Sequence, residues 1–136
     1  MIQRALPYLT ERKGSVVNVS SVTDIRSFPR ILSYCVSKDA VDQLTHCVNF
    51  EIAKSGVRIN AIKPGVVVTN IHRLMGMDDD SYAPFLEYSK MTNPMGRVGQ
   101  PEEAVELIYF LASPQAGWII GVTVPIDGGQ ALTCAR

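Results

Sequence analysis

SVVNVS at residues 15–20 and VRINAI at residues 57–62 decide the fold of this chain. Both segments are short, mostly apolar and rich in β-branched residues, which is typical of buried strands. Between them, residues 34–54 carry apolar side chains at three- and four-residue spacing, which predicts an amphipathic helix. A strand, a helix and a second strand in this order favour a right-handed crossover between parallel strands.

The apolar face of the predicted helix is expected to pack on the sheet. It comprises Val36, Ala40, Val41, Leu44, Cys47, Val48 and Ile52. Gly56 suits a left-handed cap at the end of this helix. The rest of the chain predicts the end of a helix at 2–10, a short helix near 81–91, a helix from Pro101 to about Ala112 and a strand at 121–126. We therefore expect an α/β fold in which about three parallel strands are flanked by helices.

Composition narrows the class of partner. The 136 residues include 13 Lys and Arg against 13 Asp and Glu, so the formal net charge is zero. This balance gives no electrostatic support for binding nucleic acid or an anionic membrane, and it favours a small-molecule partner. No apolar run approaches the roughly 20 residues of a membrane span. The three cysteines (Cys35, Cys47 and Cys134) form no CxxC pair, which indicates a reduced, cytoplasmic setting without a disulfide framework or zinc site.

Three polar residues are the candidates for chemistry. Tyr34 and Lys38 are four residues apart on the predicted helix, so their side chains share one face. A free tyrosine has a pKa of roughly 10, and a nearby ammonium stabilises its phenolate form. Such a tyrosine is able to exchange a proton with an alcohol or carbonyl oxygen. Ser21 follows the first strand, at the edge where open α/β sheets bind ligands.

Other polar residues are expected to have structural roles. The run Asp78–Asp80 is interpreted as a solvated helix cap, and we expect no metal site there. His46 and His72 are not expected to be catalytic.

Several segments in order resemble the short-chain dehydrogenase/reductase family. They are GSVVNVSSV at 14–22, YCVSK at 34–38, VRINAIKPGVVVT at 57–69 and DGG at 127–129. The resemblance extends over nearly the whole chain and is to the C-terminal half of the family domain, in the 3-oxoacyl-acyl-carrier-protein reductase-like subgroup. It implies one partial domain at 1–136, half of a Rossmann-type doubly wound parallel sheet, with a lid over the substrate at about 66–100.

The resemblance also implies a role for each matching residue. Tyr34 matches the catalytic acid/base, Lys38 the lysine that activates it and holds the nicotinamide ribose, and Ser21 the residue that orients the substrate carbonyl. The cofactor-binding positions implied are Tyr34, Lys38, Pro64, Gly65, Val67 and Thr69. The implied reaction is reversible hydride transfer between NAD or NADP and a carbonyl or alcohol substrate, in a homodimer or homotetramer. Methionines and aromatic residues between 75 and 91 indicate either a lid over a partly apolar substrate or a small helix that packs on the body of the domain.

Departures from the family pattern qualify this expectation. The glycine-rich turn of the Rossmann fold, the residue that selects NAD or NADP and the catalytic asparagine have no counterpart here, and Asn18 lies on a strand instead. Lys63 stands where asparagine is common, Asp24 where glycine is frequent and Ile120 where threonine is common. We expect the catalytic half of an oxidoreductase. The alternative is a truncated, non-catalytic chain that associates with full-length subunits. A sugar-nucleotide epimerase or dehydratase is disfavoured by the short tail after DGG.

The strand at 15–20 is expected to lack its usual neighbour on one side, which leaves an apolar edge open to aggregation or to pairing with another chain. We therefore predict that the isolated chain is marginally stable. Thermal unfolding followed by circular dichroism, combined with light scattering, tests this prediction. A cooperative transition of a soluble monomer at high temperature would contradict it.

Overall fold

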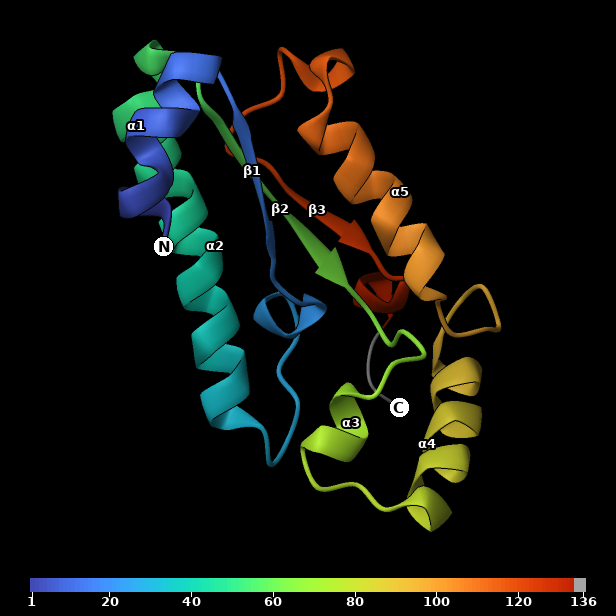
Figure 1. The fold of residues 1–136 in the computed structure, drawn as a ribbon. Coiled ribbons are helices and arrows are strands. Elements are labelled where there is room, and N and C mark those ends of the chain that lie inside the picture. The colour runs from blue at the N-terminus through green and yellow to red at the C-terminus, as the bar shows by residue number, and fades with distance from the viewer. Residues whose placement is uncertain (134–136) are drawn as a thin grey trace.

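The computed structural model describes residues 1–133, so Cys134 lies outside the described residues. Three parallel strands form one sheet in the order β1 (Ser15–Val19), β2 (Arg58–Pro64) and β3 (Thr123–Ile126) (Figure 1). Val17 is aligned with Asn60 on β2, and Ile62 with Val124 on β3. All three strands therefore end at the same edge of the sheet, and the predicted α/β class is confirmed.

Helices cover both faces of the sheet. The α-helices are α1 (Ile2–Arg12), α2 (Leu32–Ile52), α3 (Ile71–Leu74), α4 (Asp79–Thr92) and α5 (Pro101–Ala112). Short 3₁₀ turns are η1 (Val22–Asp24), η2 (Ala53–Ser55), η3 (Pro114–Ala116) and η4 (Gln130–Leu132). In Figure 1, α1 and α2 lie on one side of the strands and α5 on the other, while α3 and α4 lie beyond their carboxyl ends. No helix in this described part is long and apolar enough to span a membrane.

Most predicted elements are present with shifted ends. Helix α1 continues two residues beyond the expected 2–10, to Arg12, and α2 begins two residues before Tyr34, at Leu32. The second strand, expected at 57–62, continues two residues further and ends at Pro64. Pro64 needs no amide hydrogen at the last position of β2, where it is aligned with Ile126. Gly56 has a φ of 80°, as expected of a left-handed cap, and the short helix α3 is new.

The burial of α2 differs from the prediction. Its apolar side chains are exposed or only half-buried, and Leu44 is 45% exposed. The side chains of α2 that are buried are instead polar, namely Asp42, Thr45 and Asn49. These residues continue the face that carries Tyr34 and Lys38. The helix thus turns a polar stripe toward the sheet and leaves its apolar stripe outward.

The buried stripe of α2 is hydrogen-bonded to the sheet. The Asn18 amide of β1 donates to the Thr45 hydroxyl at 2.8 Å. The side-chain oxygen of Asn49, Oδ1, accepts from the Ile59 backbone amide of β2 at 3.0 Å. Because buried polar groups need partners, these bonds fix the rotation of α2 about its axis.

The apolar core lies on the central strand. Ile59, Ala61 and Ile62 of β2 are fully buried, and Leu111 of α5 is 1% exposed. No residue of β1 is fully buried, and within residues 1–133 this strand pairs with β2 alone. The expected open edge is therefore present in the described chain.

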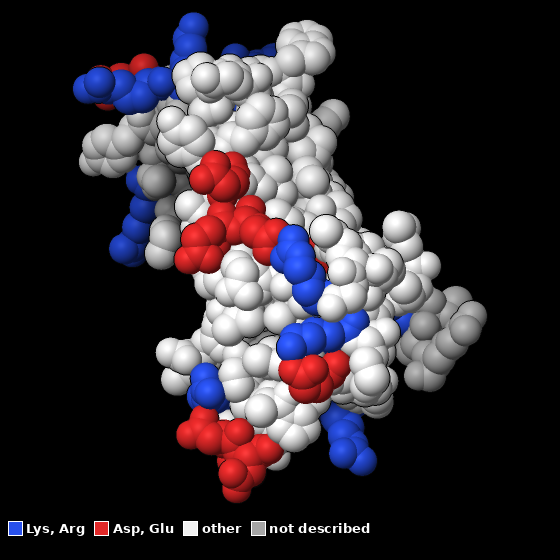
Figure 2. Space-filling model, turned by 90° about the vertical axis from the view of Figure 1, so that its right-hand side faces the viewer, with Lys and Arg blue, Asp and Glu red and all other residues white. Residues whose placement is uncertain are grey.

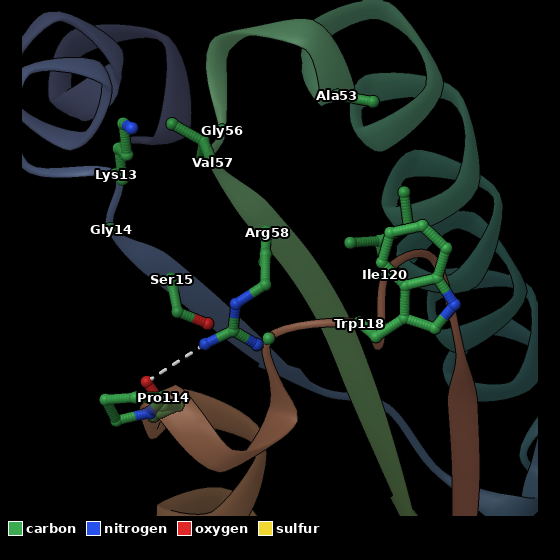
Figure 3. Close-up of a pocket in the computed structure, with 12 residues that line it drawn as sticks. Lys13, Gly14, Ser15, Ala53, Gly56, Val57, Arg58, Pro114, Trp118 and Ile120 are labelled. Atoms are coloured by element: carbon green, nitrogen blue, oxygen red, sulfur yellow. Dashed lines mark hydrogen bonds between the residues drawn. The ribbon is translucent and has the colours of Figure 1, made fainter.

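Arg58, the first residue of β2, joins the amino end of this strand to the end of α5. Its guanidinium donates to four backbone carbonyls, at distances of 2.7–3.2 Å, from Leu111, Ala112, Ser113 and Ala116. The carbonyls of Leu111 and Ala112 lie in the last turn of α5, where they lack partners within the helix, and a cation suits the negative end of its dipole. Figure 3 shows Arg58 between β2 and this turn, beside a hollow of about 730 Å³. Trp118 lies at the same hollow and is 98% exposed.

The segment between β2 and α5 folds around Tyr82. The Tyr82 hydroxyl donates to the Thr69 carbonyl at 3.1 Å, and the Arg73 guanidinium lies 4.0 Å from the Tyr82 ring centroid. The His72 ring is half-buried, with its centroid 4.5 Å from that of Phe85. Asp78 caps α4 by accepting from the Ser81 amide, as the cap interpretation predicted.

On the α4–α5 face, basic side chains lie next to acidic ones (Figure 2). Arg97 binds both carboxylate oxygens of Glu103, at 2.8 and 2.7 Å. The guanidinium lowers the pKa of Glu103 to about 2, and this carboxylate also caps the start of α5 through the Gln100 amide. Further pairs join Arg73 to Asp79 and Lys90 to Glu87. Opposite charges thus neutralise one another locally along this face.

Replacing Arg58 with methionine should destabilise the chain. The substitution keeps much of the apolar stem but removes charge-assisted donors from four helix-end carbonyls, so we expect a loss of about 2–3 kcal/mol in the free energy of unfolding. Urea unfolding followed by circular dichroism measures this loss. Arg12→Met is the matched control, because Arg12 is exposed, and its effect should stay within about 0.5 kcal/mol. Equal effects of the two substitutions would contradict the role of Arg58.

Burial lowers the pKa of His72, so lowering the pH should destabilise the folded state. A histidine with a lowered folded-state pKa contributes stability above its unfolded pKa of about 6.5, and this stability is lost as the pH falls. His72→Gln should therefore reduce the fall in Tm between about pH 7.5 and 5.5. His46→Gln is the control, because His46 is exposed. Scanning calorimetry at both pH values decides; an unchanged pH dependence in His72→Gln would reject the prediction.

Candidate active site

Tyr34 and Lys38 meet where β1 ends and α2 begins. Both side chains are half-buried, and the Lys38 ammonium nitrogen lies 5.5 Å from the centroid of the Tyr34 ring. The same ammonium donates to the Val19 carbonyl, the last residue of β1, at 2.9 Å. The pair thus places a phenol and an ammonium next to each other at the carboxyl end of β1.

Ser21 lies two residues beyond that carbonyl and is 6% exposed. Its hydroxyl oxygen caps η1 by accepting from the Thr23 amide at 3.3 Å. The preceding Ser20 is also buried, and its hydroxyl donates to the Lys38 carbonyl at 3.2 Å. The NVSS turn is thus attached to α2 at the turn of helix that carries Lys38.

Pro64 and Gly65 lie at the carboxyl end of β2 and pack against the DGG segment. A Cβ atom on Gly65 would come within 2.7 Å of the Gln130 side-chain oxygen and 2.9 Å of the Asp127 Cβ. The Gln130 oxygen also accepts from the Val66 amide at 3.3 Å. The close approach excludes any larger residue at position 65 unless the DGG segment moves.

The DGG segment is fixed in turn by its own side chains. The Asp127 carboxylate accepts from the amides of Gly129 and Ala131, at 2.9 and 2.7 Å. Arg26, which follows η1, donates to the Gln130 carbonyl at 2.6 Å. These bonds connect the Ser21 turn and the Pro64–Gly65 turn through the last described residues.

Val67 and Thr69 lie farther along the same segment and have other neighbours. Val67 forms a parallel bridge with Gly99 and lines a hollow of about 140 Å³ at the start of α5. Thr69 is exposed, and its hydroxyl accepts from the Ile71 amide at 3.4 Å. The structure thus brings Tyr34 and Lys38 together beside the Ser21 turn, whereas Val67 and Thr69 extend from Gly65 toward α3.

A buried ionic cluster lies among these segments, and sequence reasoning missed it. The Lys63 ammonium lies 2.6 Å from a carboxylate oxygen of Asp42 and also binds the carboxylate of Asp24. Lys63 is 8% exposed and Asp42 is 6% exposed. Two positions that depart from the family pattern, 24 and 63, are therefore partners in space. The available signal was a lysine at the end of an apolar strand, which requires an acidic partner if it is buried.

The cluster shares one cation between two carboxylates. Burial raises the pKa of Asp24, and the adjacent Asp42 raises it further against the opposing effect of Lys63. Burial alone would raise the pKa of Asp42, but hydrogen bonds from Asp24 and Lys63 outweigh it and lower this pKa. Burial alone would lower the pKa of Lys63, but the two carboxylates raise it. The negative charge is thus held most firmly on Asp42.

No group of three or more His, Cys, Asp or Glu among residues 1–133 is arranged to hold a metal ion. The chemistry that the described residues can supply is proton transfer and hydrogen bonding at the carboxyl ends of the strands. The hollow beside Arg58 lies at the opposite edge, where the four carbonyl contacts already occupy the guanidinium.

Comparisons with known proteins show the family of the chain. The family model described as enoyl-(acyl carrier protein) reductase matches residues 1–131. The chain is 36% identical to 3beta-hydroxysteroid dehydrogenase 1 of Eggerthella lenta over 132 residues, which are 96% of this chain and 49% of that protein. It is also 36% identical to the 3-oxoacyl-[acyl-carrier-protein] reductase FabG of Thermotoga maritima over 131 residues, which are 96% of this chain and 51% of that protein.

A solved structure shares the fold closely. The crystal structure of a short-chain dehydrogenase/reductase of unknown function from Caenorhabditis elegans, with cofactor, superposes with a TM-score of 0.93 at 34% identity. The match covers 99% of this chain and 52% of that one. The chain spans about half the length of the curated relatives it matches. From the family match and these relatives, the chain belongs to the short-chain dehydrogenase/reductase family of oxidoreductases.

Proposed function

We propose that this chain is the catalytic, C-terminal half of an NAD- or NADP-dependent oxidoreductase that acts on a carbonyl or alcohol. The observation that carries the proposal is the Tyr34–Lys38 pair, placed at the end of β1 beside the Ser21 turn. A nicotinamide nucleotide would supply or accept the hydride. The chain itself supplies proton transfer and orientation at the substrate oxygen.

Each residue has a distinct proposed task. The Tyr34 hydroxyl gives its proton to the carbonyl oxygen during reduction and takes it back during oxidation. The Ser21 hydroxyl donates a hydrogen bond to the same oxygen. The Lys38 ammonium stabilises the Tyr34 phenolate. Since the Val19 carbonyl accepts only one of its three N–H donors, the remaining donors are left for the hydroxyls of a ribose.

The residues around Gly65 are assigned to the cofactor by their place in the fold. Pro64, Gly65 and Val67 are half-buried at the carboxyl end of β2, where parallel sheets bind nucleotides. We assign them, with the exposed Thr69, to the nicotinamide end of the cofactor. Both NAD and NADP are compatible with this assignment, because the residues concerned contact the half of the cofactor that the two share.

We propose that residues 66–100 act as a lid over the substrate. They include α3 and α4, which lie beyond the carboxyl ends of the strands (Figure 1). Exposed apolar side chains on this segment are Ile71, Leu74, Met75, Tyr88, Met91 and Met95. Their exposure favours a substrate with an apolar part, because such a substrate would cover them.

A second candidate function is association with complete subunits of the family without catalysis. The outward apolar stripe of α2 favours it, since Val36, Leu44 and the nearby Phe50 are 56%, 45% and 87% exposed. The same surface would serve in a homodimer or homotetramer of the whole protein. Cofactor binding separates the candidates, because an associating chain needs none.

Substitution of Tyr34 and Lys38 tests the proposal. In hydride-transfer assays of the chain together with a complementary N-terminal segment of the family domain, Tyr34→Phe should abolish turnover, because the variant lacks the exchangeable proton. In calorimetric titrations with NADH and NADPH, Tyr34→Phe should leave the Kd nearly unchanged, whereas Lys38→Ala should raise it about tenfold or more.

Tyr109→Phe is the matched control, because Tyr109 is exposed on α5 and belongs to no part of the site. It should leave turnover unchanged. Turnover by Tyr34→Phe at the unsubstituted rate would remove Tyr34 from the mechanism. A folded chain that binds neither nucleotide, alone or with the complementary segment, would favour the associating function.

A further inference from the structure

We propose that Lys63 is a positioning residue of this site: its ammonium, held between Asp24 and Asp42, fixes the Ser21 turn against α2. The inference rests on the proposed function in one respect, the role of Ser21 in orienting the substrate oxygen. It concerns residues that touch neither substrate nor cofactor in that proposal.

The cluster joins the three segments that carry the proposed catalytic and cofactor-binding residues. Asp24 is the last residue of η1, the turn that Ser21 caps. Asp42 lies on α2 one helical turn after Lys38, and Lys63 immediately precedes Pro64 and Gly65 on β2. The Lys63 ammonium therefore links η1, α2 and β2 close to the residues of the proposed site.

Burial makes this link strong and specific. The side chains of Lys63 and both carboxylates are 9% exposed. A charge at such a site is tolerated only when it is paired. The Oδ1 atom of Asp24 and both carboxylate oxygens of Asp42 are buried without a hydrogen-bond partner among residues 1–133, so the Lys63 ammonium is the charge that compensates them. Without the cation, the two neighbouring carboxylates would repel each other unless Asp24 took up a proton, and in either case the link from η1 to Lys63 would be lost.

Repulsion would act first on η1, because it is the weakest of the three joined segments. This single turn is held by the Ile25 and Arg26 amides, which both donate to the Val22 carbonyl at 3.1 Å, and by the Ser21 cap. The central strand β2 and the long helix α2 are supported by many other bonds. We therefore expect loss of Lys63 to release the Ser21 turn and to leave the sheet in place.

Amide hydrogen exchange on the whole chain, read residue by residue by NMR, tests the inference. In Lys63→Asn, the Ile25 and Arg26 amides should exchange about tenfold faster relative to the Ala61 amide, which bonds across the sheet to Val122. The double variant Asp24→Asn/Lys63→Asn removes one charge of each sign. It should return the ratio to within about threefold of the unsubstituted chain.

Lys90→Asn is the matched control, because it breaks an exposed pair with Glu87 and should leave the ratio unchanged. A merely structural lysine would lower Tm in Lys63→Asn while η1 and β2 amides accelerate together. That result, or a double variant no better than Lys63→Asn, would overturn the proposal. If Lys63→Asn does not fold, recovery of a folded chain with a protected η1 in the double variant still supports it, and an unfolded double variant rejects it.

Hydride transfer provides an independent readout. In the assembly with a complementary segment, Lys63→Asn should lower kcat about tenfold with the KM for the nucleotide unchanged, and the double variant should recover. Failure of all variants and of the unsubstituted chain to bind nucleotide would refute the proposed function alone. The exchange ratios would still decide the role of Lys63.

Discussion

Helix α2 is docked on the sheet by buried polar side chains, and the arrangement of the site follows from this docking. Thr45 and Asn49 are hydrogen-bonded to groups of β1 and β2, and Asp42 is ion-paired with Lys63 near the end of β2. A polar contact is directional, so it specifies the rotation of the helix more narrowly than apolar packing would. Because Tyr34 and Lys38 lie on the same stripe, this rotation directs them to the carboxyl end of β1. The same rotation leaves the apolar side chains of α2 facing outward.

The parallel register then gathers the remaining parts. β1 and β2 end side by side, so the turns that follow them, with Ser21 and with Pro64 and Gly65, are neighbours at one edge. The DGG segment packs against Gly65. The Arg26 side chain, which follows the Ser21 turn, donates a hydrogen bond to the Gln130 carbonyl just after this segment. The Lys63 cluster lies where these turns and α2 converge. Several short segments, each weak alone, thus hold one another at the site.

The sequence predicted the strand and helix order and the Tyr34–Lys38 pair well, because periodicity and four-residue spacing are local properties. It did not predict which face of α2 is buried. Apolar periodicity marks an apolar stripe, but Asp42, Thr45 and Asn49 gain partners only after the chain folds. The Lys63–Asp24 contact was unpredictable for the same reason, since 39 residues separate the partners in the chain. Helix α3 is a single turn, too short for a periodic signal. The roles of Ser21, Tyr34 and Lys38 remain predictions.

Trp118, the one tryptophan of the chain, lines the hollow at the amino ends of β1 and β2, and it is already 98% exposed in the folded chain. Its indole is in contact with water before any unfolding takes place. Intrinsic emission should therefore change little when the chain loses its structure, and a flat emission trace would be a poor measure of stability. The same position makes the indole a reporter for a different event, because a subunit that covers this hollow would move it into an apolar environment and shift its emission to the blue.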